Sequence, residues 1–164
     1  MPYASLQGMF ESPERYTARI HGSAGFLGRM APEVIGVLAE QHERKPAPQG
    51  SVLIQPLGGA FARVPEGTTA LGRRDAPWAW QAGAAWFDPA HDDAVRAWAA
   101  GLDEALRPWS CGEPYPNFIL GRDVERLRAS YGPATCERLR SIRAAWDPDG
   151  VLGAGHAIPL RERR

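Results

Sequence analysis

Apolar and polar residues alternate most regularly between Pro77 and Trp86. One face of this segment is apolar throughout, and it holds Trp78, Trp80, Ala82, Ala84 and Trp86. Gln81 and Gly83 fall on the opposite face. Because successive side chains of a β-strand point to opposite faces, this period of two predicts a strand with one buried face. Weaker alternation and short apolar runs predict further strands over residues 16–21, 51–56 and 60–64.

Apolar residues at helical spacing predict the clearest helix between Asp88 and Leu106. Asp88 or Asp92 can cap its start, and its buried face is expected to hold Val95, Trp98, Leu102 and Leu106. Further helices are predicted over residues 30–43, 123–130 and 133–146, the last with Cys136, Leu139 and Ile142 on its inner face. Strands and helices alternate irregularly. The predicted fold class is therefore α+β, an antiparallel β-sheet covered by helices on one face, with a C-terminal helical segment and tail.

The 164 residues suit a single domain, and 19 basic residues balance 19 acidic ones to a formal net charge of zero. Proteins that bind nucleic acid or anionic membranes usually have more basic than acidic residues, so neither partner is expected. No run of about 18 apolar residues predicts a membrane span, and the first residues lack the pattern of a signal peptide. We therefore expect a soluble cytoplasmic protein.

Motifs for the common cofactor and nucleophile sites do not occur. Gly22, Gly25 and Gly28 are spaced three apart and do not match the G-x-G-x-x-G dinucleotide loop, and neither a P-loop nor a G-x-S-x-G elbow is found. Cys111 and Cys136 form no CxxC pair, which disfavours a zinc site or a disulfide framework. The tryptophans are interpreted as core residues, with stacking of a flat aromatic ligand as the alternative. Composition and spacing alone thus indicate only an α+β domain.

Short motifs later in the chain carry more information. Tyr115-Pro116-Asn117-Phe118 has the form Y-x-N-[FY], and it is followed by Tyr131-Gly132, Glu137-Arg138-Leu139, Trp146-Asp147-Pro148-Asp149 and a final Ile158-Pro159. This order resembles the C-terminal end of the berberine-bridge-enzyme-like flavin oxidases. Upstream, a strand pair of the same family is similar to Gly58-Gly59-Ala60, Thr69-Ala70-Leu71 and Arg73-Arg74.

The resemblance covers nearly the whole chain. Residues 1–110 resemble the family's substrate domain, and residues 111–164 resemble the C-terminal segment that packs back against the flavin domain. The N-terminal FAD-binding half of the family has no counterpart in this sequence. The resemblance therefore implies FAD as the cofactor, and a chain that either works with a separately encoded flavin subunit or is a truncated copy.

Site residues follow from the same match. Tyr115 and Asn117 are expected to contact the flavin or the substrate, and Tyr115 is the candidate catalytic residue. Where the fourth motif position is Tyr, it can serve the family as the catalytic base, but this chain has Phe118, which cannot titrate. The expected substrate-binding residues are Phe118, Arg63, Arg74 and Gln81. For Tyr115, Arg63, Arg74 and Gln81, a structural role in the fold is the alternative.

The predicted function is that of the substrate-domain portion of an FAD-dependent oxidoreductase, inactive as an isolated chain. Such an enzyme would oxidise an alcohol or an activated C–H bond of a small molecule. A flavin-binding partner chain, or self-association, would cover the exposed apolar face. The alternatives are a non-catalytic relic or binding module on the same fold, and a small cofactor-free α+β enzyme.

Overall fold

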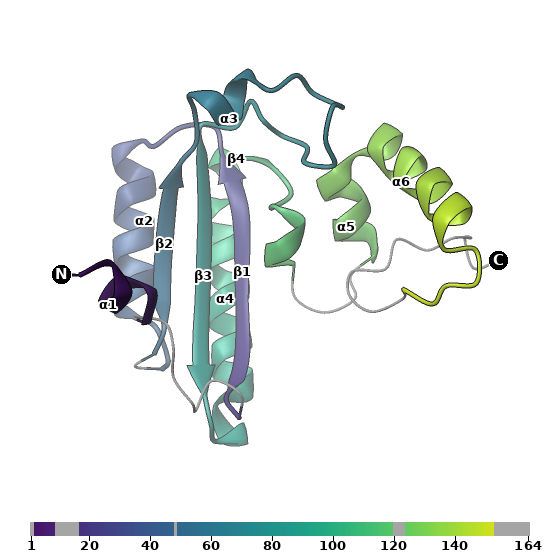
Figure 1. Cartoon of the computed structure of the whole chain (residues 1–164). Coiled ribbons are helices and arrows are strands. Elements are labelled where there is room, and N and C mark those ends of the chain that lie inside the picture. The colour runs from purple at the N-terminus through teal and green to yellow at the C-terminus, as the bar shows by residue number, and fades with distance from the viewer. Residues whose placement is uncertain (1, 9–16, 48, 120–123, 153–164) are drawn as a thin grey trace.

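The structure, a computed structural model, describes residues 2–8, 17–47, 49–119 and 124–152. In this part of the chain, four strands form one antiparallel sheet in the order β2-β3-β1-β4 (Figure 1). The strands are β1 (Arg19–Leu27), β2 (Ser51–Pro56), β3 (Trp78–Trp86) and β4 (Ser110–Gly112). The predicted α+β class with an antiparallel sheet is confirmed.

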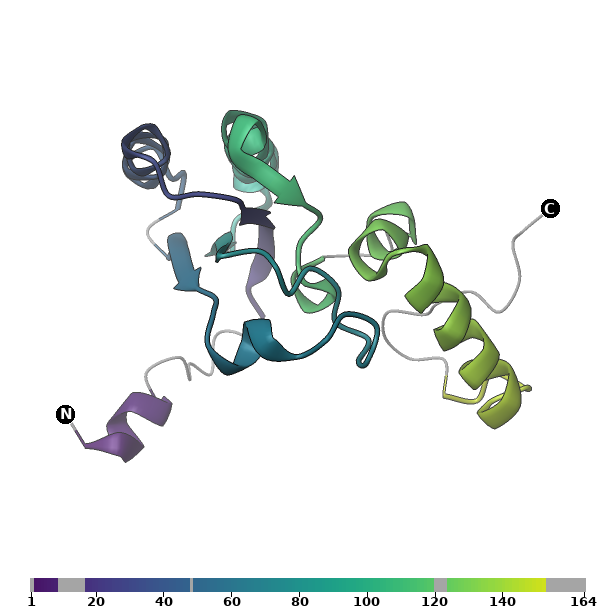
Figure 2. The same ribbon diagram turned by 90° about the horizontal axis from the view of Figure 1, so that it is seen from above.

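Two long helices cover one face of this sheet, α2 (Pro32–Glu43) and α4 (Asp92–Leu106) (Figure 2). The order β1-α2-β2-β3-α4-β4 repeats a strand-helix-strand unit twice, as in ferredoxin-like folds. β3 pairs with β1 along its whole length, from Arg19 opposite Trp86 to Leu27 opposite Trp78. The face that carries no long helix is called the open face below.

The remaining elements lie around this sheet. They are α1 (Tyr3–Gln7), α3 (Ala60–Arg63), α5 (Val124–Tyr131), α6 (Pro133–Trp146) and three single 3₁₀ turns, η3 (Pro89–His91), η4 (Arg107–Trp109) and η5 (Pro116–Phe118). α5 and α6 stand beside the sheet, beyond β1 and the short strand β4 (Figures 1 and 2). Within the described residues, no helix is long and apolar enough to cross a membrane.

The core fills the space between β3 and the two long helices. As predicted, the apolar face of β3 is buried there, with Trp80 and Trp86 packed against Val95, Trp98, Leu102 and Leu106 of α4 and against Val34 and Leu38 of α2. The indole Nε1 of Trp98 donates a 2.8 Å hydrogen bond to the carbonyl of Gln41, which ties α4 to α2. The tryptophans of β3 are therefore core residues.

Two predicted elements, and the predicted orientation of one side chain, differ from the structure. Residues 60–64 do not form a strand, because Gly59 turns the chain at φ 55° and Phe61 donates its N–H to the carbonyl of Gly58, starting α3. The first strand extends to Leu27, well beyond residue 21, because Gly22 and Gly25 lie inside the strand rather than in a turn. Ile142 does not face inward on α6, since it is 46% exposed. Tyr16 and the final Ile158-Pro159 lie outside the described residues.

Asp92 connects the start of α4 to the sheet. Its carboxylate accepts two 2.6 Å hydrogen bonds from Arg19 of β1 and one of 2.8 Å from the indole of Trp86. The hydrogen bond from Arg19 holds the pKa of Asp92 below its ordinary value. The preceding turn, η3, is capped by Asp88, whose carboxylate accepts a 2.9 Å hydrogen bond from the N–H of Ala90.

The two cysteines, Cys111 and Cys136, are free thiols. Cys136 is buried on α6, and Cys111 is half-buried on β4. Burial raises the pKa of both thiols.

We expect Gly25→Ala to lower the free energy of unfolding by about 1–3 kcal/mol. An added Cβ at Gly25 would stand 2.6 Å from Nε1 of Trp80, which is fixed in the core. The matched control is Gly101→Ala on α4, where a Cβ meets nothing within 4 Å. That change should raise the unfolding free energy by about 0.5–1 kcal/mol, because alanine favours a helix. Urea denaturation measures both, and equal effects would contradict this packing.

The Asp92 contacts predict an acid-sensitive fold. A carboxyl whose pKa is lowered by folding stabilises the protein fully above its unfolded pKa and loses that contribution as pH falls through the folded pKa. The unfolding free energy should therefore decrease more steeply below about pH 4 in the natural chain than in Asp92→Asn. Thermal melts between about pH 2 and 6 test this. The exposed neighbour Asp93, changed to Asn, should keep the natural slope.

Candidate functional site

Gln81 is the polar side chain at the centre of the open face. In the register of the sheet it stands between Ala24 of β1 and Leu53 of β2, with its side chain opposite in direction to those of Trp80 and Ala82. Its strand neighbours on this face are small or apolar. The predicted placement of Gln81 opposite the tryptophan face is confirmed.

Two prolines bring the Y-x-N-[FY] motif to this face. β4 ends at Gly112, whose φ of 146° suits glycine, and Pro114 and Pro116 cannot donate backbone hydrogen bonds to a longer strand. Pro116 instead begins η5, as its fixed φ allows. The buried hydroxyl of Ser130 on α5 donates a 2.5 Å hydrogen bond to the carbonyl of Pro114. These constraints fix the course of the chain just before the motif.

A small cavity of about 90 Å³ lies between this motif and the sheet. Its lining includes Asn117 and Phe118 from η5, Gln81 and Gly83 from β3, and Ile20 to Ser23 from β1. The structure thus brings together three of the predicted site residues, Gln81, Asn117 and Phe118, although they are distant in sequence.

Tyr115 stands next to this cavity. Its hydroxyl accepts a 3.0 Å hydrogen bond from Nδ2 of Asn117, and its ring meets that of Phe118 edge to face, with 5.6 Å between the ring centroids. Tyr115 is 36% exposed. The motif is therefore a connected polar and aromatic group, open to solvent on one side.

The two predicted arginines lie elsewhere. Arg63 ends the short helix α3 and is exposed, and it does not lie on the strand that the sequence predicted. Arg74 donates hydrogen bonds to the carbonyl of Phe61 at 3.0 Å and to the hydroxyl of Thr69 at 2.8 Å. Its guanidinium also stacks 5.1 Å from the centroid of the Phe61 ring. Arg74 thus holds the segment between β2 and β3.

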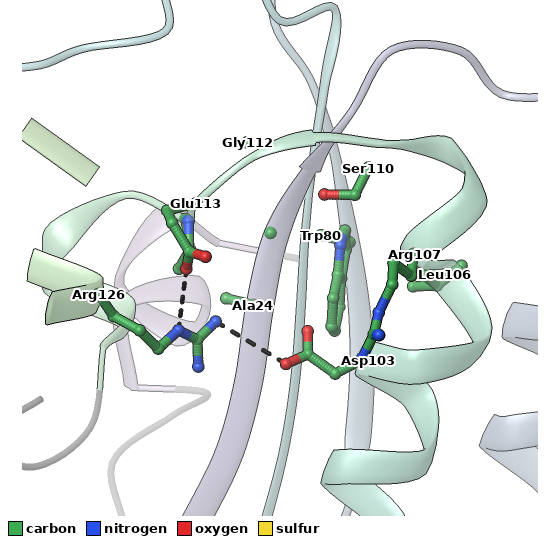
Figure 3. A pocket seen from close by; sticks show the side chains of 11 residues that line it. Ala24, Trp80, Asp103, Leu106, Arg107, Ser110, Gly112, Glu113 and Arg126 are labelled. Atoms are coloured by element: carbon green, nitrogen blue, oxygen red, sulfur yellow. Dashed lines mark hydrogen bonds and ion pairs between the residues drawn. The ribbon is translucent and has the colours of Figure 1, made fainter. Parts of the chain in front are cut away.

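A larger cavity of about 430 Å³ was not foreseen from the sequence (Figure 3). It lies beside Ala24 and Gly25 of β1. Arg126 of α5 donates from Nε to Glu113 at 2.9 Å, and its NH2 lies 3.9 Å from a carboxylate oxygen of Asp103 on α4. Glu113 adjoins the motif, but nothing in the sequence pattern connects Arg126 with Asp103.

Tyr131 is a second titratable group that sequence reasoning did not assign to the site. It ends α5, and burial raises the pKa of its phenol, with smaller contributions from Cys136 and Tyr115. Its Tyr-Gly motif was the available signal. Within the described residues, no group of His, Cys, Asp or Glu side chains could hold a metal ion.

Comparisons with known proteins place this geometry in a family context. No protein-family model matches the sequence. Aclacinomycin-N/aclacinomycin-A oxidase from Streptomyces galilaeus is 33% identical over 129 residues, which is 68% of this chain and 23% of that protein. The FAD-linked oxidoreductase YgaK from Bacillus subtilis is 28% identical over 167 residues, which cover 99% of this chain and 36% of YgaK. The homologues of this chain are FAD-linked oxidoreductases.

Solved structures agree on the fold. Berberine bridge enzyme from Eschscholzia californica aligns with a TM-score of 0.75 over 98% of this chain and 36% of that protein, at 18% identity. Physcomitrella patens BBE-like 1 aligns with a TM-score of 0.74 over 94% and 34%, at 19% identity. The chain therefore has the fold of part of a berberine bridge enzyme-like protein. It spans 23–36% of the length of these relatives.

We expect Ser130→Ala to lower the unfolding free energy by about 1–3 kcal/mol, because it leaves the buried carbonyl of Pro114 without its partner. The matched control, Ser141→Ala, removes an exposed hydroxyl on α6 that bonds only its own helix, and should change stability by less than about 0.5 kcal/mol. Urea denaturation gives both values. If the hydroxyl holds the motif in place, the NMR signals of Asn117 and Phe118 move in Ser130→Ala alone.

Proposed function

We propose that this chain forms the substrate side of an FAD-dependent oxidoreductase that oxidises an alcohol or an activated C–H bond of a small molecule. The observation that carries the proposal is the convergence of Gln81, Asn117 and Phe118 on one cavity of the open face. The FAD-linked relatives and the berberine bridge enzyme-like fold support it. Residues 1–110 would form the substrate-domain part and residues 111–164 the C-terminal segment.

The residues of the cavity suit a substrate or a flavin ring more than a whole dinucleotide. The amides of Gln81 and Asn117 can each donate and accept, which suits a substrate hydroxyl or the polar edge of a ring. The sequence contains no G-x-G-x-x-G loop for a pyrophosphate. Bound FAD would supply the acceptor for a hydride. The phosphates would be held by the flavin-binding part of the protein, outside the residues described.

Tyr115 is the residue we assign to proton transfer. Within the Y-x-N-[FY] motif it has the ionisable oxygen, and Asn117 already donates to that oxygen at 3.0 Å. This phenol oxygen can exchange a proton with a substrate hydroxyl that is held beside it. Phe118 would provide an apolar wall of the cavity. Arg63 is free of the core at the end of α3 and would meet an anionic part of a substrate, and Arg74 would shape the same region through the segment it holds.

A flavin-binding partner is the second part of the proposal. The open face exposes Ile20 by 60% and Leu53 by 45%, and the end of α6 exposes Trp146 by 83%. Exposed apolar surface of this kind marks a contact with another protein part. We assign it to the flavin-binding polypeptide, encoded separately or as another part of the same chain. Without that polypeptide, the same surface would promote self-association.

A non-catalytic binding module is the second candidate function. It is favoured by Phe118, since a phenyl ring cannot act as the base that a tyrosine supplies at this position. The same amides would then bind a small molecule without turnover. Reduction of the flavin in the complex distinguishes the two candidates, because an enzyme reduces the flavin and a binding module does not.

The decisive experiment co-expresses this chain with the polypeptide encoded directly before it, to test whether that polypeptide binds flavin. We expect a yellow complex whose flavin absorbance is bleached anaerobically by a member of a panel of primary and secondary alcohols. Gln81→Leu should slow this reduction about 10- to 100-fold, because an oriented polar contact is lost. Gln55→Leu is the matched control, since Gln55 is exposed on β2 and lies outside the cavity lining.

Two results would count against catalysis. A colourless mixture that shows no flavin spectrum would contradict the proposed flavin-dependent function. A yellow complex that binds a ligand more weakly in Gln81→Leu than in Gln55→Leu, and whose flavin is reduced by no ligand, favours the binding module.

A further inference from the structure

Three glycines lie inside the long paired strands β1 and β3, where glycine weakens a strand and needs a reason. They are Gly22 and Gly25 of β1 and Gly83 of β3. A Cβ added at Gly22 would collide with the carbonyl oxygen of Ala82 and stand 2.9 Å from Cα of Gly83. One added at Gly25 would stand 2.6 Å from Nε1 of Trp80. Close packing between β1 and β3 therefore requires the two glycines of β1.

The fold of the described residues does not require the third glycine, Gly83. Its φ is not positive, and the pairing of β3 with β1 continues past it without a bulge. Within the part of the chain that the structure describes, an added Cβ would have one atom within 4 Å, the carbonyl oxygen of His21 at 3.8 Å. Asn117 and Phe118 of the motif therefore need no glycine at this position either. A mid-strand glycine of this kind is typical of a place where a ligand approaches the backbone closely.

Gly83 lies in a depression of the open face. Its partners in register are Gly22 on β1 and Ser51 on β2, so this row across the sheet has no side chain larger than that of serine. Gln81 stands on one side of the row and Ile20 on the other, and both line the cavity of about 90 Å³ together with Gly22 and Gly83. The space that a side chain at residue 83 would occupy is therefore part of this cavity.

The volume of the cavity limits what it can hold. About 90 Å³ equals the share of roughly three molecules of liquid water, whereas benzene occupies engineered cavities of roughly 150 Å³. The cavity therefore admits a hydroxyl-bearing carbon with a short substituent, but not a ring. Larger parts of a substrate would lie outside the cavity on the open face, where Ile20 and Leu53 expose their apolar side chains by 60% and 45%.

We propose that Gly83 determines the substrate class by leaving room for a second substituent on the carbon that is oxidised. The substrate is then a secondary alcohol, whose hydroxyl is held by the amides of Gln81 and Asn117 at the wall of the cavity. Its short substituent lies over the backbone of Gly83 and Gly22, and its larger substituent extends over the open face. The inference rests on the proposed function, because it takes this cavity as the alcohol site.

A primary alcohol leaves the space over Gly83 empty. Its oxidised carbon has a single substituent, which extends over the open face as the larger substituent of a secondary alcohol does. An unfilled space forfeits the van der Waals contacts of its walls. One carbon more or less in an apolar pocket changes kcat/KM by roughly 10- to 200-fold. The natural protein is therefore expected to prefer a secondary alcohol to its primary isomer.

The test compares a secondary alcohol with its primary isomer in the yellow complex of the preceding experiment. 1-Phenylethanol and 2-phenylethanol form such a pair, and bleaching of the flavin absorbance without oxygen gives the rate of reduction. Gly83→Val should slow reduction by 1-phenylethanol at least about tenfold, because the valine side chain takes the space of the methyl group. Reduction by 2-phenylethanol should change less than about threefold. Each alcohol is compared with itself in two proteins, so differences in intrinsic reactivity cancel.

Ala85→Val is the matched control for added bulk. Ala85 lies on the same strand and the same face as Gly83, but outside the cavity lining. This variant should keep the natural rates with both alcohols. The smaller change Gly83→Ala fills less of the space, so it should lower the ratio of the two rates by less than Gly83→Val does.

Melting temperatures distinguish a role of Gly83 in specificity from a role in folding. Gly83→Ala and Gly83→Val should melt no lower than the natural chain, because an added Cβ has room and glycine weakens a strand interior. Gly22→Ala should melt lower, because its Cβ collides with the carbonyl oxygen of Ala82. If Gly83→Ala melts as low as Gly22→Ala, Gly83 serves the fold and the inference is wrong.

NMR titration of the chain alone gives a readout that does not depend on flavin. 1-Phenylethanol should shift the side-chain amide signals of Gln81 and Asn117 more in the natural chain than in Gly83→Val. Ala85→Val should respond as the natural chain does. Equal shifts in all three proteins would contradict binding over Gly83.

Failure of the inference can be told apart from failure of the proposed function. Reduction of the natural complex by primary alcohols only, or equal slowing of both isomers in Gly83→Val, would overturn the inference and leave the flavin-dependent function intact. Absence of reduction by any alcohol would contradict the proposed function and the inference together.

Discussion

The packing of indole rings between β3 and α4 determines the rest of the architecture. Trp80 and Trp86 project from one face of β3 and are almost completely buried against Val95, Leu102 and their neighbours on α4. Aromatic side chains bury large areas, so this contact dominates the hydrophobic stabilisation of the sheet. Because residues of a strand alternate between faces, burying the tryptophans turns Gln81 and Gly83 outward. The core and the open face are thus two consequences of one alternating segment.

Long periodic segments could be predicted from the sequence with good bounds. β2 spans 51–56 and α6 spans 133–146, as the pattern indicates, and β3 and α4 each bury the residues expected of them. The prediction failed where glycine obscured the pattern. β1 contains Gly22 and Gly25, which sequence reasoning associates with turns, but here they allow the close approach of Ala82 and Trp80. α3 followed a glycine pair and was too short to show a period.

The candidate site could be predicted only in part. Gln81 follows from the alternation of β3, and Asn117 and Phe118 follow from a short motif, but no local pattern places them on one cavity. That meeting depends on where β4 ends and on the hydroxyl of Ser130, which holds the carbonyl of Pro114. The pair of Arg126 with Asp103 is likewise a product of tertiary structure, because it joins two helices that are not adjacent in the chain. Arg63 was placed on a strand that does not form.

The burial of the two thiols has a consequence for their resistance to oxidation. The thiolate is the form of cysteine that reacts with peroxides and disulfides, and its population falls as the pKa rises. Burial raises the pKa of both Cys111 and Cys136, so each remains almost entirely protonated near neutral pH. Hydrogen peroxide would therefore attack them slowly. Neither cysteine is therefore suited to act as a redox-sensing thiol.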